Sequence, residues 1–319
     1  MSLRRFILKR VLLIFPLLLG VSIVTFSLVK LTPGNPVQVA IGLNPDMGPQ
    51  EIARLKQRYG LTKPAWQQYL NWLSDIVLHA DFGTTYGARE QEVSEIIVNK
   101  LPETVALGIF GWVFAVAIAI PTGIYAAVRK DELGDHVSRF VALAGISLPN
   151  FWLGLMLILI FSVSLNVFPV TAPRTPLWHP KTLAFLLMPG ITIGTASASN
   201  LMRIMRSSMS EEMNKEYVTA ARAKGLPERT VVLKHVLRNS LISVTTVAAF
   251  LTASIVAGSV VVETVFGWRG LGLELIRAVR NRQVDLILGI TLFTGTAIIL
   301  ANLLADILYA VLDPRIRYD

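Results

Sequence analysis

Cysteine is absent from the sequence, and charged residues are scarce, at 16% of 319 residues. Without cysteine the chain has no disulfide bonds, thiolate nucleophiles or zinc–thiolate sites. Soluble globular domains carry about a quarter charged residues, so a soluble two-domain protein is disfavoured. The 53% apolar content and the mean hydropathy of +0.57 exclude a disordered chain, because disorder requires low hydrophobicity. The composition therefore favours a membrane protein.

Motifs for covalent chemistry are missing as well. The sequence has no G-x-x-x-x-G-K-[ST] phosphate-binding loop and no H-E-x-x-H metal motif. Gly267, Gly270 and Gly272 do not form G-x-G-x-x-G. The four histidines lie outside the long apolar stretches, so a membrane-embedded serine protease would lack its base. We therefore expect no enzyme activity, no catalytic residue, and no metal or cofactor held by this chain.

Long apolar stretches are what the sequence does have. About 18 or more consecutive apolar residues mark a candidate transmembrane helix, and six stretches qualify: 11–31, 104–128, 140–165, 183–202, 241–262 and 286–312. The apolar run of the first is longer than the roughly 7–15 residues of a signal-peptide core, so we expect a retained anchor. The predicted fold is all-α, a polytopic membrane protein with six transmembrane helices.

The basic residues predict the orientation of these helices. With the N-terminus inside, the inside segments hold 17 of the 30 Lys and Arg residues: four before the first stretch, three in 129–139, eight in 203–238 and two in the tail. The short outside loops hold six. Because Lys and Arg concentrate in cytoplasmic loops, both termini are predicted to be cytoplasmic, in a multi-pass protein of the cell membrane. The net charge of +9 is then mostly a topology signal, and no motif indicates a nucleic-acid partner.

Four regions follow from this topology. Residues 1–31 form the cytoplasmic N-terminal end and the first helix, and 32–100 a helical extracytoplasmic region. Residues 101–312 form a five-helix core that includes a cytoplasmic loop at 203–240, and 313–319 form a cytoplasmic tail. Within 32–100, helical spacing of apolar residues predicts one helix from Pro49 to Tyr59 and another from Pro64 to Leu78. The apolar stripe of each must be covered by the other helix, by the membrane surface or by a partner, and packing of the two on each other is favoured.

The cytoplasmic loop carries a second kind of pattern. Ser208 and Glu211 have the spacing of a capping box, which predicts a helix from there to Lys224, stopped by Gly225, with Pro227 opening the next helix. Tyr217, Val218, Ala221 and Gly225 share one face of that helix. An amphipathic helix lying on the inner membrane surface is one interpretation. The face buries little apolar area, however, and its small residues favour docking into a groove on a partner protein.

Specific strings resemble a known family. EYVTAARAKGL (216–226), followed by HVLRNSL (235–241), resembles the cytoplasmic signature of permease subunits of binding-protein-dependent ATP-binding-cassette importers. That signature reads E-A-A, three residues, Gly, nine residues, Ile-x-Leu-Pro. Ala220, Ala221, Gly225 and Leu237 match it, whereas Thr219, His235 and Arg238 depart from it.

The departures are themselves similar to one subfamily, the dipeptide, oligopeptide and nickel permeases. Further strings resemble it along most of the chain: LTPGNP (31–36), YGLTKPAWQQYLNWL (59–73), DFGTT (81–85), SLPNFWLG (147–154), ETVFGWRGLG (263–272) and LDPRIR (312–317). In the glycine-rich string, Trp268-Arg269 stands where an apolar residue and proline are common. The long segment after the first helix resembles the first of the two permease subunits.

The resemblance implies a type I importer permease fold that forms half of a translocation pathway for di- or oligopeptides. It implies three kinds of partner besides the lipid bilayer: a homologous second permease, two ATP-hydrolysing subunits that hold ATP and Mg, and an extracytoplasmic substrate-binding protein. Carried over by position, the residues that contact the ATPase would be Glu216, Tyr217, Ala220, Ala221, Arg222 and Gly225. Nickel and glutathione remain alternative substrates.

Polar residues inside the stretches are the remaining candidates, because they are costly in a membrane. Those on the fourth and fifth stretches could line a wet pathway or form interhelical and intrahelical hydrogen bonds: Thr192, Thr195, Ser199, Asn200, Thr245, Thr252 and Ser259. Asn302 and Asp306 lie in the sixth. Asp306 leaves open a secondary transporter coupled to an ion gradient, and a subunit without transport is a third class. Glu263 and Arg269 flank the glycine-rich string, in a solvated turn or in contact with the binding protein.

Overall fold

The computed structural model describes residues 3–31, 37–38, 41, 47–58, 60–86, 90–257 and 260–312. Its regular elements are helices, and an isolated bridge joins Thr84 to Glu92. The first part of the chain forms α1 (Leu3–Leu31), α3 (Pro49–Arg58), α4 (Ala65–His79), α5 (Val93–Val128), α6 (Leu133–Ser147), α7 (Asn150–Leu157) and the π-helix η1 (Ile158–Ser164). The second part forms α8 (Pro180–Phe185), α9 (Leu187–Glu212), α10 (Glu216–Ala223), α11 (Glu228–Thr230), the π-helix η2 (Val231–Val236), α12 (Leu237–Ala257), α13 (Val260–Phe266), α14 (Leu271–Arg280) and α15 (Val284–Leu312).

Four helices in the described residues are long and apolar enough to cross a membrane: Ile7–Leu31, Val93–Val128, Pro180–Glu212 and Val284–Ile307. They contain the first, second and fourth predicted stretches and most of the sixth, which α15 covers in full. The fifth stretch falls on α12 and α13, with residues 258–259 outside the described part of the chain. The polytopic, all-helical architecture is therefore confirmed.

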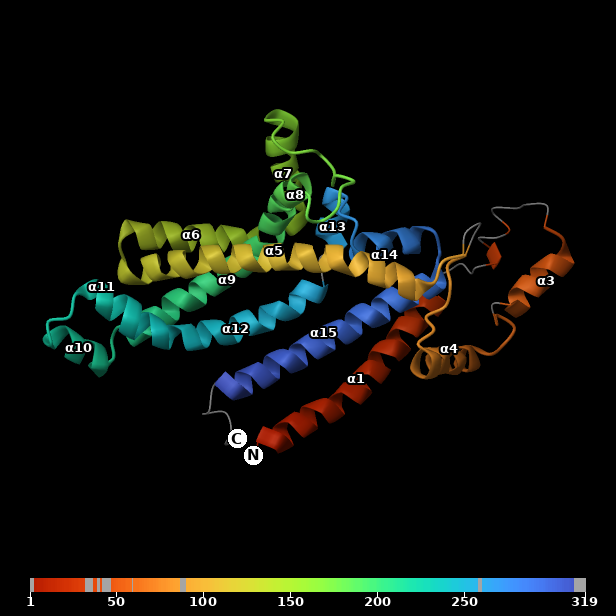
Figure 1. Cartoon of the computed structure of the whole chain (residues 1–319), viewed down its shortest axis with the longest axis horizontal. Coiled ribbons are helices and arrows are strands. Elements are labelled where there is room, and N and C mark those ends of the chain that lie inside the picture. The colour runs from red at the N-terminus through yellow and green to blue at the C-terminus, as the bar shows by residue number, and fades with distance from the viewer. Residues whose placement is uncertain are drawn as a thin grey trace.

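The third predicted stretch is not one straight helix, which corrects the prediction for 140–165. The chain bends by 103° between α6 and the pair α7–η1. The break lies at Leu148 and Pro149, where Leu148 is extended with φ −77° and ψ 125°. The proline ring disfavours the α-helical backbone conformation of the residue that precedes it. For this reason α6 ends at Ser147, and a new helix begins after Pro149. The result is a broken span or a re-entrant hairpin that projects from the bundle with α8 (Figure 1).

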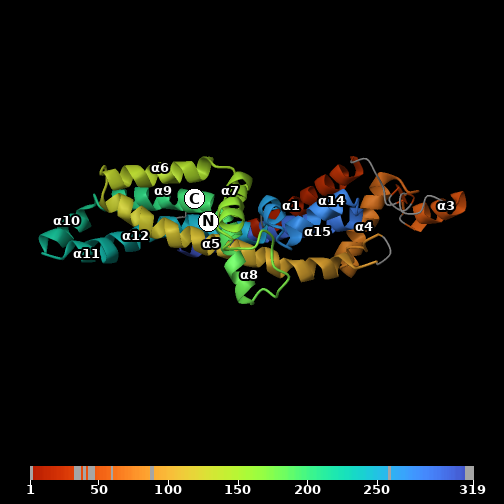
Figure 2. The ribbon, with the colours of Figure 1, turned by 90° about the horizontal axis from the view of Figure 1, so that it is seen from above.

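The helices form an elongated, flat bundle along α5 (Figures 1 and 2). α9 packs along α5, α12 lies between α9 and α15, and α1 packs on α15. Small residues allow the close approach of α5 and α9. A Cβ atom at Gly194 would lie 2.5 Å from the carbonyl oxygen of Gly111, and one at Gly123 would lie 2.6 Å from Cβ of Met205.

The two non-membrane regions lie at opposite ends of this bundle. α10 and α11 are at one end, and α3 and α4 are at the other (Figures 1 and 2). The bounds of α3 and α4 agree with the two helices predicted there, except that Tyr59 lies outside the described residues. α4 packs against α1, where the hydroxyls of Tyr69 and Ser22 are 2.8 Å apart and Phe26 contacts Tyr69 and Trp72. α1 therefore covers only the Tyr69 and Trp72 side of α4, whereas Trp66, Leu70 and Val77 of its apolar stripe remain exposed.

Candidate coupling site

The loop between α9 and α12 folds into a compact helical unit. α9 continues to Glu212, so Ser208 lies inside that helix and donates to the Ser240 carbonyl at 3.2 Å. The predicted capping box at Ser208 is therefore wrong, because the membrane helix simply extends beyond the apolar stretch. The predicted stop is confirmed: Gly225 has φ +75°, a left-handed conformation that favours glycine. Pro227 then caps α11.

One face of α10 is turned towards the chain's own core. Val218 and Ala221 are buried, in one apolar cluster with Val231 and Val236 of η2. Tyr217 is half-buried beside them. Of the four residues predicted to form a small-residue docking face, three thus pack inside this subunit, and Ala221 belongs to that internal contact. Helical spacing correctly placed these residues on one face, but this face packs on the chain's own core and not in a groove of a partner protein.

The opposite face of α10 is exposed. It carries the remaining residues predicted to contact an ATPase, together with their neighbours on the surface: Glu216, Thr219, Ala220, Arg222, Ala223 and Gly225. Arg222 forms a bidentate ion pair with Glu228 of α11, at 2.7 Å from NH2 to Oε1 and 3.1 Å from Nε to Oε2. The guanidinium lowers the pKa of Glu228, and the carboxylate raises the pKa of Arg222. The pair connects α10 to α11 across Gly225.

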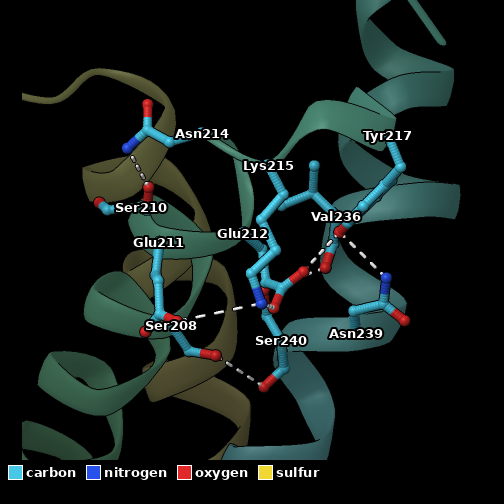
Figure 3. Close-up of polar contacts among 10 residues, drawn as sticks. All are labelled: Ser208, Ser210, Glu211, Glu212, Asn214, Lys215, Tyr217, Val236, Asn239 and Ser240. Atoms are coloured by element: carbon cyan, nitrogen blue, oxygen red, sulfur yellow. Dashed lines mark hydrogen bonds and ion pairs between the residues drawn. The ribbon is translucent and has the colours of Figure 1, made fainter. Parts of the chain in front are cut away.

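A polar network holds α10 to the membrane helices (Figure 3). The Tyr217 hydroxyl donates to Oε2 of Glu212 at 2.5 Å and accepts from Nδ2 of Asn239 at 3.0 Å. Lys215 binds the other carboxylate oxygen of Glu212, with Nζ 2.5 Å from Oε1. Burial, together with the bond to Glu212, raises the pKa of Tyr217, so the phenol remains protonated. Sequence reasoning missed Glu212 and Asn239 as members of the site, because they are brought together only by the fold.

A buried ion pair connects α6 to α9 near the same end. Asp135 is fully buried and accepts from Nε and NH2 of Arg206 at 2.6 and 2.7 Å. Arg139 lies 3.3 Å from the same carboxylate, and the Asp131 amide donates to it at 3.0 Å. The sequence offered no signal for this pairing, since Asp135 and Arg206 are 71 positions apart.

The hydroxyl residues of the predicted pathway make mostly local bonds. Thr192 is fully buried and donates to the Met188 carbonyl at 2.9 Å, and Thr195 donates to the Ile191 carbonyl at 2.6 Å. Thr195 and Ser199 line a 340 Å³ pocket between α5, α6 and α9, and Asn200 accepts from Arg203 at 3.1 Å. Thr245 is exposed on α12, whereas the Thr252 side chain and Ser259 lie outside the described residues.

Asp306 has a charged partner. Its Oδ2 lies 2.7 Å from NH1 of Arg10, so an ion pair connects α15 to α1. The Asp306 side chain is 13% exposed and that of Arg10 is 45% exposed. Asn302 lies half-buried one turn away. The carboxylate that suggested an ion-coupled transporter thus joins two helices.

The glycine-rich string joins α13 to α14, and it is not a solvated turn at Glu263. This side chain is fully buried and accepts from Thr104 Oγ1 at 2.9 Å and from the Leu273 amide at 3.0 Å. Thr104 accepts from the Leu271 amide at 2.8 Å, so the two side chains cap α14. Arg269 donates to the Pro173 carbonyl at 2.8 Å, and this bond holds the loop that precedes α8.

Comparison with known proteins tests the resemblance suggested by the loop. Residues 119–318 match the family model for the binding-protein-dependent transport system inner membrane component, and residues 3–108 match the model for its N-terminal part. The chain belongs to this family. The membrane permease inferred from the sequence strings is thereby confirmed, and so is its membership of binding-protein-dependent transport systems.

Similar proteins align over almost the whole chain. The oligopeptide transport system permease protein AppB of Bacillus subtilis (strain 168) is 36% identical over 316 residues, covering 98% of this chain and 99% of the relative. The dipeptide transport system permease protein DppB of Escherichia coli (strain K12) is 36% identical over 338 residues, with the same coverage. The di/tripeptide transport system permease protein DppB of Pseudomonas aeruginosa (strain UCBPP-PA14) is 36% identical over 335 residues. These relatives are named as transport permeases rather than enzymes.

Proposed function

We propose that this chain is one of two permease subunits of an ATP-binding-cassette importer for di- and oligopeptides. The observation that carries the proposal is the near full-length similarity to dipeptide and oligopeptide permeases, at 36% identity. The chain forms half of the translocation pathway and performs no covalent chemistry. ATP and Mg are bound by two separate ATPase subunits, and an extracytoplasmic binding protein delivers the peptide.

The membrane arrangement that we propose has six spans with both termini cytoplasmic. The four long apolar helices, the bent pair α6–η1 and the helix α12 supply the six. The concentration of Lys and Arg in the loop that contains α10 supports a cytoplasmic position for that end. The position of α4 at the opposite end of the bundle supports an extracytoplasmic position for 32–100 (Figure 1). The membrane is then the cytoplasmic, or inner, membrane.

The exposed face of α10 is the contact that we propose for the ATPase. Glu216, Ala220, Arg222 and Gly225 lie on or beside this face. Tyr217 and Ala221 do not lie on this exposed face. They contribute indirectly, because they pack α10 against the rest of its own subunit. Closure of the ATPase dimer would displace α10 and thereby α9 and α12. For the pathway, the pocket bordered by Thr195 and Ser199 is the candidate wall, and the second permease supplies the facing half.

Co-purification and transport test this function together. The tagged chain is extracted gently from its native membrane, its partners are identified by mass spectrometry, and the complex is reconstituted with its binding protein. We expect a homologous permease, ATPase subunits, and ATP-driven uptake of a labelled dipeptide that competing oligopeptide reduces and nickel or glutathione does not. Gly225→Arg should abolish uptake while membrane insertion survives. Uptake driven by an ion gradient alone, or normal uptake by Gly225→Arg, would contradict the proposal.

A further inference from the structure

We propose that the Tyr217 hydroxyl is a positioning group that locks α10 onto α9 and α12, so that movement of α10 is passed to the membrane helices. This inference rests on the proposed function and adds to it the residue that makes the connection rigid. Tyr217 itself faces inward and is half-buried, so it acts through other residues rather than as part of the exposed partner surface.

A helix as short as α10 needs external contacts to hold its direction. It has eight residues and is separated from α9 by the turn Met213–Lys215 and from α11 by Lys224–Pro227. Isolated helices shorter than about 12 residues are marginal in water. These two non-helical connections would absorb a displacement of α10 unless other contacts transmit it.

The apolar contact of α10 cannot define its direction alone. Val218 and Ala221 belong to one apolar cluster with Val231 and Val236 of η2 and Met209 of α9. Apolar burial is non-directional, and valine against alanine allows a helix to slide or roll. A hydrogen bond weakens steeply when its angle changes, so polar contacts are what can fix the orientation of α10.

The hydroxyl of Tyr217 is placed to do this. It bonds at the same time to Glu212, the last residue of α9, and to Asn239 in the first turn of α12 (Figure 3). The bond to Glu212 has a charged acceptor, and such bonds are shorter and about twice as strong as neutral ones. The Glu212 side chain is only 14% exposed, and Lys215 occupies its second oxygen. One phenol thus joins the last turn of one membrane helix to the first turn of another.

The ion pair between Arg222 and Glu228 connects α10 to a different neighbour. Arg222 and Glu228 are 43% and 57% exposed, and their pair connects α10 to α11, not to a membrane helix. Exposed ion pairs contribute little. The connection from α10 to α9 and α12 therefore depends on the Tyr217 network and on the apolar contact.

The test uses the complete transporter in proteoliposomes, with peptide uptake and ATP hydrolysis measured on the same samples. Tyr217→Phe removes the hydroxyl and keeps the ring. We expect ATPase subunits to co-purify at the wild-type ratio and the KM for ATP to change less than about twofold, while peptide imported per ATP hydrolysed falls about five- to tenfold. Asn214→Ala is the matched control, because Asn214 lies in the same turn, is exposed and has a side chain that donates to the Ser210 carbonyl within its own segment; it should import as the wild type does.

Two further variants separate positioning from general destabilisation. Glu212→Gln keeps an acceptor oxygen for Tyr217 and should retain most of the import per ATP, whereas Glu212→Ala should resemble Tyr217→Phe. The double variant Tyr217→Phe with Glu212→Ala should be no worse than either single variant, because both break one connection. Wild-type import per ATP in Tyr217→Phe, or loss of ATPase subunits from that complex, would overturn the inference.

A second measurement does not depend on the substrate. Because the chain has no cysteine, Lys224→Cys and Arg238→Cys place two spin labels on α10's end and on α12 without other changes. In the purified full chain we expect one narrow distance distribution, which broadens when Tyr217→Phe is added. An unchanged distribution would overturn the inference. Failure of wild-type peptide uptake would instead contradict the proposed function. The distance distribution would still test the role of the Tyr217 hydroxyl, because its measurement needs no substrate.

Discussion

The two ends of the molecule hold a short helix in different ways. At one end α14 begins on a fully buried carboxylate, Glu263, with Thr104 completing the cap and Trp268 stacked on Phe185 beneath it. At the other end α10 has a buried apolar contact through Val218 and Ala221, but its polar contacts remain partly exposed: Tyr217, Lys215 and the pair Arg222–Glu228. Buried polar contacts are costly to break, whereas exposed ones are readily remade. We call the region around α14 the fixed end and the region around α10 the movable end, in line with the proposed displacement of α10 by an ATPase.

The largest effect should come from the buried ion pair that joins α6 and α9 below the movable end. Asp135→Leu leaves the Arg206 guanidinium, 18% exposed, without its main partner. Breaking one side of a buried pair costs about 3–5 kcal/mol. Thermal unfolding of the purified chain in detergent should show this loss, with Glu132→Gln, an exposed residue nearby, as the control. A loss of unfolding free energy below about 1 kcal/mol would mean that the contact between α6 and α9 is as easily broken as the contacts of α10, so that α6 belongs to the movable end.

The second effect tests the fixed end. Glu263→Ala removes the acceptor for Thr104 and for the Leu273 amide, and leaves buried donors unsatisfied. We expect a loss of about 2–3 kcal/mol in unfolding free energy. Glu274→Gln, on α14 itself and outside the cap, should change stability by less than about 0.5 kcal/mol. Equal effects of the two variants would remove the contrast between the two ends.

A smaller effect is expected at Gly225. Its φ of +75° is strained for any residue with a Cβ, although no atom lies within 4 Å of the position that a Cβ would take. Gly225→Ala should therefore cost about 1 kcal/mol through the backbone alone. Gly48→Ala, where there is equally no obstruction and no positive φ, is the matched control. Urea or thermal titration of both variants measures the difference, and a loss above about 3 kcal/mol would point to a packing role for Gly225.

The smallest effect concerns pH at the movable end. The Arg222 guanidinium lowers the pKa of Glu228, so this pair stabilises the folded loop above the unfolded pKa and loses that contribution as pH falls through the folded value. Because both side chains are largely exposed, Glu228→Gln should cost at most about 0.5 kcal/mol near neutral pH. Unfolding of wild type and variant should converge in acid, and a difference that grows in acid would contradict the assignment.

Much of the fold could be predicted from the sequence, because the signals are local. Apolar length located α1, α5, α9 and α15, and Gly225 with Pro227 located the end of α10. The strings around α10 identified the family. Local signals failed where distant residues compete: the capping box at Ser208 was overridden by the continuation of α9, and the stretch 140–165 is divided at Pro149.

The sequence alone therefore determined that this is a helical permease of a binding-protein-dependent transport system, because helix length, glycine stops and family strings are written in neighbouring residues. The tertiary structure decided which face of α10 is free, that Glu263 caps α14, and that Asp306 pairs with Arg10. Thr104 and Glu263 are 159 positions apart, and Tyr217 and Asn239 are on separate helices. Such contacts depend on how helices pack, since a face of small residues looks the same in sequence whether its own core or a partner covers it.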